Sequence, residues 1–314
     1  MATPEATAAG VNSIPHQPPR LVPANGIELC YEIFGADDAE PMLLVMGLGA
    51  QMVVWDDGFC QQLAGRGFRV IRFDNRDIGQ STNLGGGGQR VTMTELLKLR
   101  FLGIPVSAPY KLSDMAADVI GLLDALGIRS AHLVGASMGG MIAQELALLH
   151  PQRVRSLTSI MSSTGNPKLP QPTREAAALL LRPPPTNLDE YVARFKQTWK
   201  ILRVGSFPLD EAKDRELATR IYGRGLNPAG AARQLRAILA SGSRKERLKS
   251  LRVPTLVIHG TVDPLIRPEA GKEAAASIPG SKLMMIEGMG HALPIPMWPE
   301  VIEAIADHAH GARG

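Results

Sequence analysis

A serine within the pentapeptide GASMG, residues 135–139, has the surroundings that a hydrolytic nucleophile needs. This GxSxG pattern directly follows an apolar run and precedes a helical stretch from Met141 to His150. A sharp turn from strand to helix exposes the hydroxyl of Ser137, and the two glycines make room for the backbone to double back. The helix that starts there also directs amide N–H groups toward negative charge developing near Ser137. The pattern indicates a nucleophilic serine.

A serine hydroxyl is a weak nucleophile until a base removes its proton, so a histidine and an acid are required later in the chain. Asp263 follows the apolar run from Thr255 to His259, and His291 follows the run from Lys282 to Ile286. We expect His291 to accept the proton of Ser137, and Asp263 to hold the imidazole in the correct tautomer. Because Asp263 precedes a proline, its alternative role is that of a turn residue.

The reaction also needs hydrogen-bond donors for the oxyanion that forms on the attacked carbonyl group. The residue after the nucleophile, Met138, is expected to supply one backbone N–H group. The second is expected from Leu48, in the sequence MGLG that follows an early apolar run. Losing one such donor typically costs roughly 3 kcal/mol of transition-state stabilisation.

Short runs rich in Val, Ile and Leu alternate with longer segments of helical period, which is typical of a mainly parallel sheet flanked by helices. Since each candidate site residue lies just past the carboxyl end of a strand, the loops that carry them should meet at one edge of the sheet. The strands are expected at Ile27–Phe34, Met42–Met46, Arg69–Asp74, Ala131–Gly135, Val154–Met161, Thr255–His259 and Lys282–Ile286.

The chain is expected to divide into three units, namely an N-terminal arm, a core and a cap. Residues 1–25 contain five prolines and no apolar run, so we interpret them as a flexible N-terminal arm. Residues 26–163 and 251–310 form the catalytic core, and residues 164–250 form an inserted helical cap. Within that cap, Trp199, Leu202 and Phe207 are expected to belong to the cap core rather than contact substrate. The glycine run 85–88 lacks the residues of a phosphate-binding loop and is expected to be a mobile loop.

The 314 residues are 45% hydrophobic and 20% charged, and the 34 Lys and Arg residues are dispersed among 30 Asp and Glu residues. This composition indicates neither a nucleic-acid partner nor a membrane partner. The two cysteines, Cys30 and Cys60, have no metal-ligand or redox spacing, which favours a cytoplasmic location. The seven histidines are scattered without an HExxH pattern, so no metal and no cofactor are expected. A homo-oligomer is possible, and the sequence does not determine it.

Several motifs make the chain from about Ile27 to His308 resemble the α/β-hydrolase superfamily. The segments FDNRDIGQS (73–81), GASMGG (135–140) and GMGHALP (288–294) are most similar to carboxylesterases related to aclacinomycin methylesterase, and WKILRVGSFPL (199–209) is similar to their cap. The order serine, aspartate, histidine is also the order of this fold. Many relatives have His-Gly at the oxyanion loop, whereas Met46 precedes Gly47 here. The resemblance implies an α/β-hydrolase fold and hydrolysis of a carboxylic ester, for example a methyl ester, beneath a helical cap.

The sequence therefore predicts a serine hydrolase that cleaves a small-molecule carboxylic ester, either a methyl ester or a small apolar acyl ester, through an acyl-enzyme. Two alternatives use the same three residues for other chemistry, namely carbon–carbon bond hydrolysis or perhydrolysis. A third is a non-catalytic receptor or scaffold with this fold. Such a protein commonly lacks one of the three residues, and all three are present here. Enzymes with an aspartate nucleophile are disfavoured by Ser137.

Overall fold

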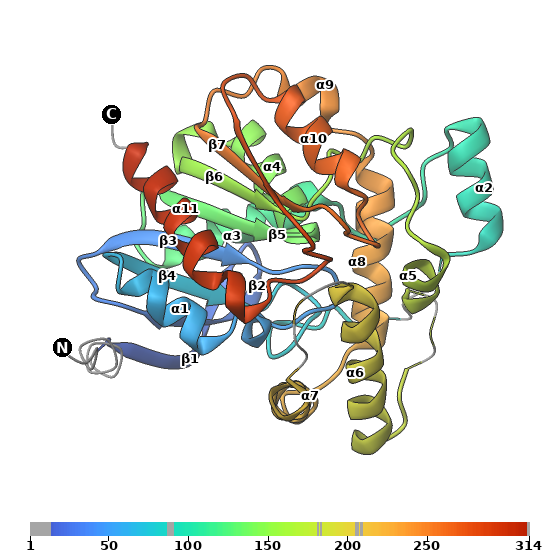
Figure 1. Cartoon of the computed structure of the whole chain (residues 1–314), viewed down its shortest axis with the longest axis horizontal. Helices are drawn as coiled ribbons and strands as arrows, with labels where there is room; N and C mark the ends of the chain where they lie inside the picture. Colours follow the sequence, from blue (N-terminus) through green and yellow to red (C-terminus); the bar gives the residue numbers. More distant parts are fainter. Residues whose placement is uncertain are drawn as a thin grey trace, which may run out of the picture.

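The computed structural model describes residues 14–86, 91–180, 182, 184–204, 207 and 210–312. Across these residues, eight strands form one sheet in the spatial order β1-β2-β4-β3-β5-β6-β7-β8 (Figure 1). The first three of these strands pair antiparallel, and all other neighbours are parallel. The predicted α/β architecture is thereby confirmed. The strands are β1 (His16–Ala24), β2 (Ile27–Phe34), β3 (Glu40–Val45), β4 (Phe68–Phe73), β5 (Ala131–Ala136), β6 (Val154–Ile160), β7 (Thr255–Gly260) and β8 (Lys282–Ile286).

The central strands read as continuous apolar runs because both faces of the sheet are covered. In β3, Leu43 and Val45 belong to the buried cluster on one face, whereas Met42 and Leu44 belong to the cluster on the other. Successive side chains of a strand point to opposite faces, so one apolar run contributes to both cores. This arrangement fixes the strand ends from which the site residues project.

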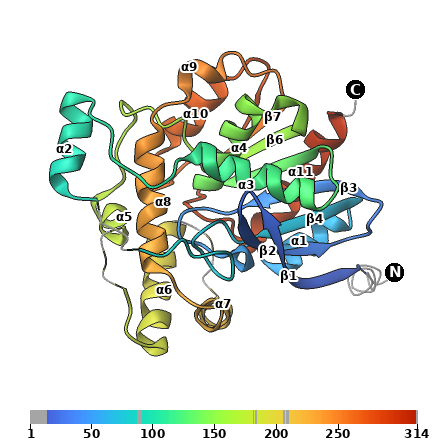
Figure 2. The same ribbon diagram turned by 180° about the vertical axis from the view of Figure 1, so that it is seen from behind.

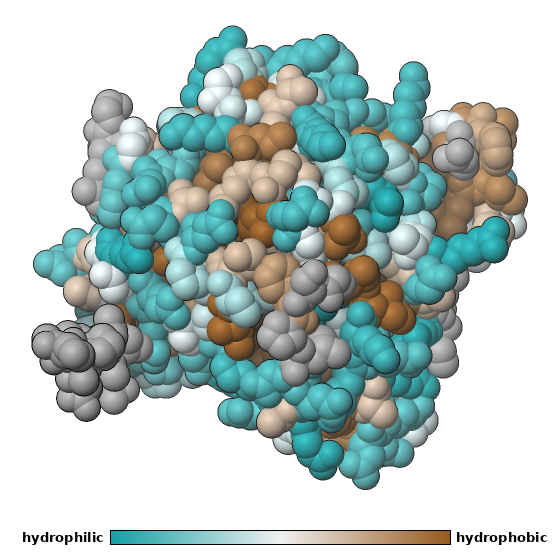
Figure 3. Space-filling model, viewed as in Figure 1, coloured by the Kyte–Doolittle hydropathy of each residue, from teal (hydrophilic) through white to brown (hydrophobic). Residues whose placement is uncertain are grey.

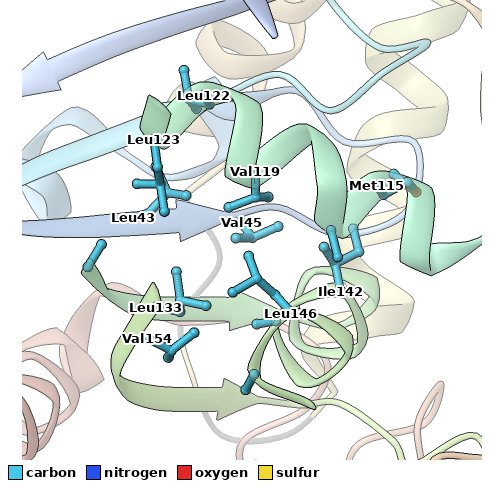
Figure 4. Packing of buried hydrophobic residues seen from close by; sticks show 14 of the residues in the cluster. Leu43, Val45, Met115, Val119, Leu122, Leu123, Leu133, Ile142, Leu146 and Val154 are labelled. Carbon is cyan, nitrogen blue, oxygen red and sulfur yellow. The ribbon is translucent and has the colours of Figure 1, made fainter. Parts of the chain in front are cut away.

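Helices cover the two faces separately. On one face, α3 (Leu112–Ala125) and α4 (Met138–Leu149) pack on β3 and β5, and Figure 4 shows Val119 and Ile142 directed toward Val45. On the other face, α1 (Asp57–Ala64) and α11 (Trp298–Gly311) bury Phe59 and Ile302 against β3 and β4. Helix α10 (Pro268–Ser277) packs against β7 and β8.

The N-terminal arm predicted over residues 1–25 is wrong for its second half, because His16–Ala24 form β1 and pair with β2. Residues 1–13 of the predicted arm lie outside the described residues. Most of β1 is exposed, so it carries no apolar pattern that would identify a strand. Its prolines fit an edge position, where a missing N–H group costs little, and the register shifts between Gln17 and Arg20, around Pro18 and Pro19.

The chain between β6 and β7 is mainly helical where it is described, as the sequence predicts for residues 164–250. Figures 1 and 2 show α5 to α8 together on one side of the sheet. We call this stretch the inserted segment. Residues 181, 183, 205, 206, 208 and 209 of the expected cap lie outside the described residues. The helices are α5 (Arg174–Leu179), α6 (Leu188–Arg203), α7 (Glu211–Gly223), α8 (Pro228–Ser241) and α9 (Lys245–Leu248).

Helix α2 (Met93–Leu102) stands apart from the sheet (Figure 1). Its apolar side chains Met93, Leu97 and Phe101 are exposed. Figure 3 shows a brown surface at the right, where α2 lies in Figure 1. Of the glycine run 85–88, Gly85 and Gly86 have positive φ angles, and residues 87 and 88 lie outside the described residues. Short 3₁₀ turns are η2 (Met52–Val54), η3 (Pro151–Arg153) and η4 (Ile295–Met297).

Candidate active site

Ser137 occupies a strained turn between β5 and α4. Its backbone angles are φ 55° and ψ −119°, a conformation that costs a non-glycine residue on the order of 1–3 kcal/mol. Backbone and side-chain hydrogen bonds hold the turn in place. The N–H group of Ser137 donates to the carbonyl oxygen of Ile160 (2.9 Å), and the hydroxyl of Ser162 donates to the carbonyl oxygen of Ser137 (2.8 Å). The serine side chain is therefore presented at the carboxyl end of the sheet.

The glycines of the GxSxG pattern are required by close backbone approaches. A Cβ atom on Gly135 would lie 2.3 Å from the carbonyl oxygen of Gly139, and one on Gly139 would lie 2.0 Å from that of Val45. These neighbours are backbone atoms, which cannot move aside as a flexible side chain could. The pattern thus specifies the packing of the turn as well as its bend.

We expect Gly139→Ala to lower the free energy of unfolding by at least about 2 kcal/mol, because the added methyl group overlaps the β3 backbone. Urea denaturation measures this loss. Gly223→Ala is the matched control, since a Cβ atom there meets nothing within 4 Å. Equal stability of the two variants would show that the turn does not depend on this contact.

The structure brings Ser137, His291 and Asp263 into one hydrogen-bonded row. His291 Nε2 lies 3.0 Å from Ser137 Oγ, and His291 Nδ1 lies 2.7 Å from Asp263 Oδ2. An ionised carboxylate only accepts, so Nδ1 carries the ring proton and Nε2 is free to accept the proton of the serine. Asp263 is fully buried and His291 nearly so. This arrangement can transfer a proton from the serine hydroxyl to the imidazole.

The loop around Asp263 holds the second carboxylate oxygen. Oδ1 accepts from the backbone N–H groups of Leu265 and Ile266, both at 2.9 Å. His259 lies beside this carboxylate, with its Nε2 3.5 Å from Asp263 Oδ2 and 2.8 Å from the carbonyl oxygen of Ile266. Burial lowers the pKa of His259, so its ring is neutral near pH 7 and donates to Ile266. His259 was predicted to lie outside the site, and its contact with Asp263 was not predicted.

The two expected oxyanion donors belong to segments that adjoin the serine. Met138 is the first residue of α4, where a backbone N–H group has no acceptor within the helix. Leu48 belongs to the loop Met46–Gly49, which passes close to the nucleophile. A Cβ atom on Gly47 would lie 3.1 Å from Ser137 Cβ and 3.6 Å from Ser137 Oγ. Glycine at position 47 therefore keeps the space next to the serine hydroxyl open.

A cavity of about 1250 Å³ opens over Ser137 and His291, between the sheet and the inserted segment. Helix α6 forms one wall, and charged side chains of α7 such as Lys213 and Arg220 lie toward its rim. Trp199 and Leu202, which the sequence predicts as cap core, both line this cavity. The apolar and aromatic wall residues of α6 repeat at helical spacing and are Tyr191, Phe195, Trp199 and Leu202. Arg194, Thr198 and Arg203 of the same helix also line the cavity.

The inserted segment also contacts the histidine loop directly. The backbone N–H group of His291 donates to the carbonyl oxygen of Leu202 at 2.7 Å. A Cβ atom on Gly290 would lie 2.2 Å from that same oxygen, so the close approach requires glycine. The C-terminal end of α6 is thus packed against the loop that carries His291.

In the described ranges, no group of three or more His, Cys, Asp or Glu side chains is arranged to hold a metal ion. Among the helices that the structure describes, none has the length and apolar character needed to cross a membrane.

Curated relatives and solved structures share this architecture. Rhodomycin D methylesterase DauP from Streptomyces sp. (strain C5) is 29% identical, and the match covers 94% of this chain and 99% of that protein. A hydrolase from Pseudomonas aeruginosa PA01 superposes with a TM-score of 0.67 at 26% identity, over 93% of this chain and 98% of the other. The meta-cleavage product hydrolase CumD from Pseudomonas fluorescens IP01 gives a TM-score of 0.72 at 21% identity, covering 94% and 98%, and supports the fold alone.

A family model adds the broadest evidence. The model described as the alpha/beta hydrolase fold matches residues 40–296, a range that includes Ser137, Asp263 and His291. The match extends over strands β3 to β8 and the inserted segment. The chain belongs to the alpha/beta hydrolase fold family.

Proposed function

We propose that this hydrolase cleaves a carboxylic ester through an acyl-enzyme on Ser137. The observation that carries the proposal is the row of hydrogen bonds from Ser137 Oγ through His291 to Asp263, at 3.0 and 2.7 Å. A serine next to a neutral imidazole that is itself oriented by a buried carboxylate is the arrangement used for acyl transfer. The methylesterase relatives support an ester as the substrate.

In the first step, Ser137 Oγ forms a bond to the ester carbonyl carbon while its proton moves to His291 Nε2. The backbone N–H groups of Met138 and Leu48 stabilise the negative charge on the carbonyl oxygen. When the carbon–oxygen bond to the alcohol breaks, His291 gives its proton to the leaving oxygen. An acyl group remains on Ser137.

In the second step, water attacks the acyl carbon and gives a proton to His291. The bond to Ser137 Oγ then breaks, and the proton returns from His291 to the serine. Asp263 stays ionised and stabilises the imidazolium that forms in each half of the reaction. The products are the carboxylic acid and the alcohol, and the residues return to their initial protonation states.

We further propose that the inserted segment, residues 164–250, acts as a cap whose inner wall selects a bulky acyl group. The cavity of about 1250 Å³ far exceeds the volume of a short acyl ester, and aromatic side chains of α6 line it. Phe195 and Trp199 pack edge to face, with ring centroids 5.8 Å apart. By analogy with the relatives, a methyl ester of a large apolar acid suits this space.

The direct test is hydrolysis of methyl and p-nitrophenyl esters of short and bulky acids, together with labelling by a fluorophosphonate read by mass spectrometry. Turnover with the label on Ser137 supports the ester hydrolase. A labelled Ser137 without ester turnover would favour carbon–carbon bond hydrolysis or perhydrolysis by the same residues. Absence of both signals would favour a non-catalytic protein with this fold.

We expect Trp199→Ala to raise KM at least about tenfold for a methyl ester of a bulky aromatic acid, because a buried aromatic contact is lost. The same variant should change KM for a short acyl ester far less, which provides an internal control. Steady-state kinetics with both substrates measures the difference. An equal change for both esters would mean that Trp199 supports the helix rather than the substrate.

A further inference from the structure

The oxyanion loop Met46–Gly49 is held at both of its ends by buried side-chain amides. Asn75 Nδ2 donates to the carbonyl oxygen of Met46 at 2.9 Å. At the other end, the N–H group of Gly49 donates to Gln234 Oε1, also at 2.9 Å. Asn75 is 2% exposed and Gln234 is 0% exposed. Leu48 lies between these two attachment points.

The orientation of the Gln234 amide is determined by its partners. Its oxygen accepts from Gly49, and its Nε2 donates to the carbonyl oxygen of Arg76 at 2.9 Å. Reversing the amide would place a donor against the N–H group of Gly49 and an acceptor against a carbonyl oxygen. Arg76 directly follows Asn75, so both attachments of the loop lead to the same turn after β4. The result is a closed set of hydrogen bonds around the loop.

The local backbone shows why these attachments control the Leu48 N–H group. The carbonyl oxygen of Gly47 belongs to the same planar peptide unit as that N–H group, and the two point in opposite directions. The Gly47 oxygen accepts from the N–H group of Ala50 at 3.3 Å, within a turn that also contains Gly49 at φ 67°. Fixing Gly49 therefore fixes this turn and, through it, the direction of the Leu48 donor.

Helix α8 is itself attached firmly to the core. Arg233 pairs with the buried carboxylate of Asp77 through two hydrogen bonds of 2.9 and 2.6 Å. Ala231, one turn before Gln234, lies against the loop, because a Cβ atom on Gly49 would be 3.3 Å from Ala231 Cβ. The residue that holds the loop thus stands on a rigid support.

We propose that Gln234, on α8 of the inserted segment, is a positioning residue for the oxyanion hole. Gln234 acts through Gly49 and has no contact with the substrate in this role. The inference rests on the ester hydrolase proposed above, since an oxyanion hole matters only if Ser137 forms a tetrahedral intermediate. Without Gln234, the loop would keep its sequence but lose the constraint on the Leu48 N–H group.

The test compares Gln234→Met with wild type. Methionine has a similar length and shape but cannot hold both backbone groups. We expect kcat for a p-nitrophenyl ester to fall about 10- to 100-fold, because a displaced oxyanion donor loses part of its effect. KM should stay within about threefold, since the donor acts mainly on the transition state. The inhibition constant of a trifluoromethyl ketone, which forms a tetrahedral adduct with Ser137, should rise in parallel with the fall in kcat/KM.

Two further variants separate positioning from general stability. Ser241→Ala, also on α8, removes an acceptor of the Leu112 N–H group (2.9 Å) away from the loop, and it should lower stability without lowering kcat. Gln234→Glu should retain more activity than Gln234→Met, because burial favours the protonated acid, which keeps one donor and one acceptor.

Each unfavourable outcome has a distinct meaning. The role of Gln234 would be overturned by any of three results. The folded Gln234→Met variant could keep the kcat of wild type, or Ser241→Ala could lose as much kcat as Gln234→Met does. The third such result is that Gln234→Glu is no more active than Gln234→Met. If wild type itself neither hydrolyses esters nor forms an adduct with the trifluoromethyl ketone, the proposed function fails, and this inference fails with it. The wild-type assay therefore distinguishes the two failures.

Discussion

Replacing Ser137 with alanine is expected to lower kcat/KM for any ester that the protein hydrolyses by at least about 10⁴-fold. The methyl group of alanine cannot form the bond to the acyl carbon, so the acyl-enzyme route is lost entirely. Residual hydrolysis would come only from substrate binding and the oxyanion donors. The measurement is steady-state hydrolysis together with fluorophosphonate labelling, and both signals should disappear. The fold should persist, because the bonds that hold the turn involve the backbone of Ser137.

The chain offers a matched control for this variant. Ser156 is also buried, and its Oγ lies 2.8 Å from His132 Nδ1, so it is a second serine paired with a histidine. It lies on β6 opposite the start of β5, at the other end of the sheet from Ser137. We expect Ser156→Ala to keep kcat/KM within about threefold of wild type. A hydrogen bond to a histidine does not by itself make a serine a nucleophile, because the other groups around the serine are needed as well. Full activity of Ser137→Ala would refute the assignment of the nucleophile.

The sequence predicted the strands and the residues at their ends well, for a physical reason. Apolar runs such as those in β5 and β7 are long enough to identify buried parallel strands. Once the strands are placed, Ser137 and Asp263 must lie at the same edge of the sheet, because parallel strands end there together. The structure indeed brings these side chains and His291 within hydrogen-bond distance of one another in a row.

The sequence failed where an element has no apolar pattern of its own. β1 is mostly exposed and rich in proline, so nothing in its residues distinguishes it from a flexible arm. Helical spacing in α6 showed which side chains share a face, but not that this face turns toward a cavity. For the same reason Trp199 and Leu202 were expected to pack within the cap, whereas they line the space above Ser137.

Tertiary hydrogen bonds were beyond reach of the sequence altogether. Gln234 and Gly49 are 185 residues apart, and a glutamine on a helix ordinarily faces solvent. Only the packing of α8 against the oxyanion loop reveals that its side chain is buried and fully hydrogen-bonded. At the other end of the loop, the hydrogen bond from Asn75 to the Met46 carbonyl oxygen joins residues 29 positions apart and is likewise not evident from the sequence.

Asp263→Asn is expected to lower kcat by about 10⁴-fold while leaving the fold intact. The asparagine oxygen can still accept from the N–H groups of Leu265 and Ile266, which now bond to Oδ1 of the carboxylate. Its amide nitrogen must then face His291 Nδ1 as a donor. That contact forces Nδ1 to accept, so the ring proton moves to Nε2 and points at the Ser137 hydroxyl. A histidine in that tautomer cannot take the serine proton.

Steady-state kinetics and the rate of fluorophosphonate labelling should both fall in Asp263→Asn, while the melting temperature changes little. Glu145→Gln provides the control, since Glu145 is a buried carboxylate that pairs with Arg247 away from the cavity. Its kcat should remain close to that of wild type even if its stability falls. Wild-type kcat in Asp263→Asn would instead assign Asp263 to the turn before Pro264 and leave the acid of the site to be found elsewhere.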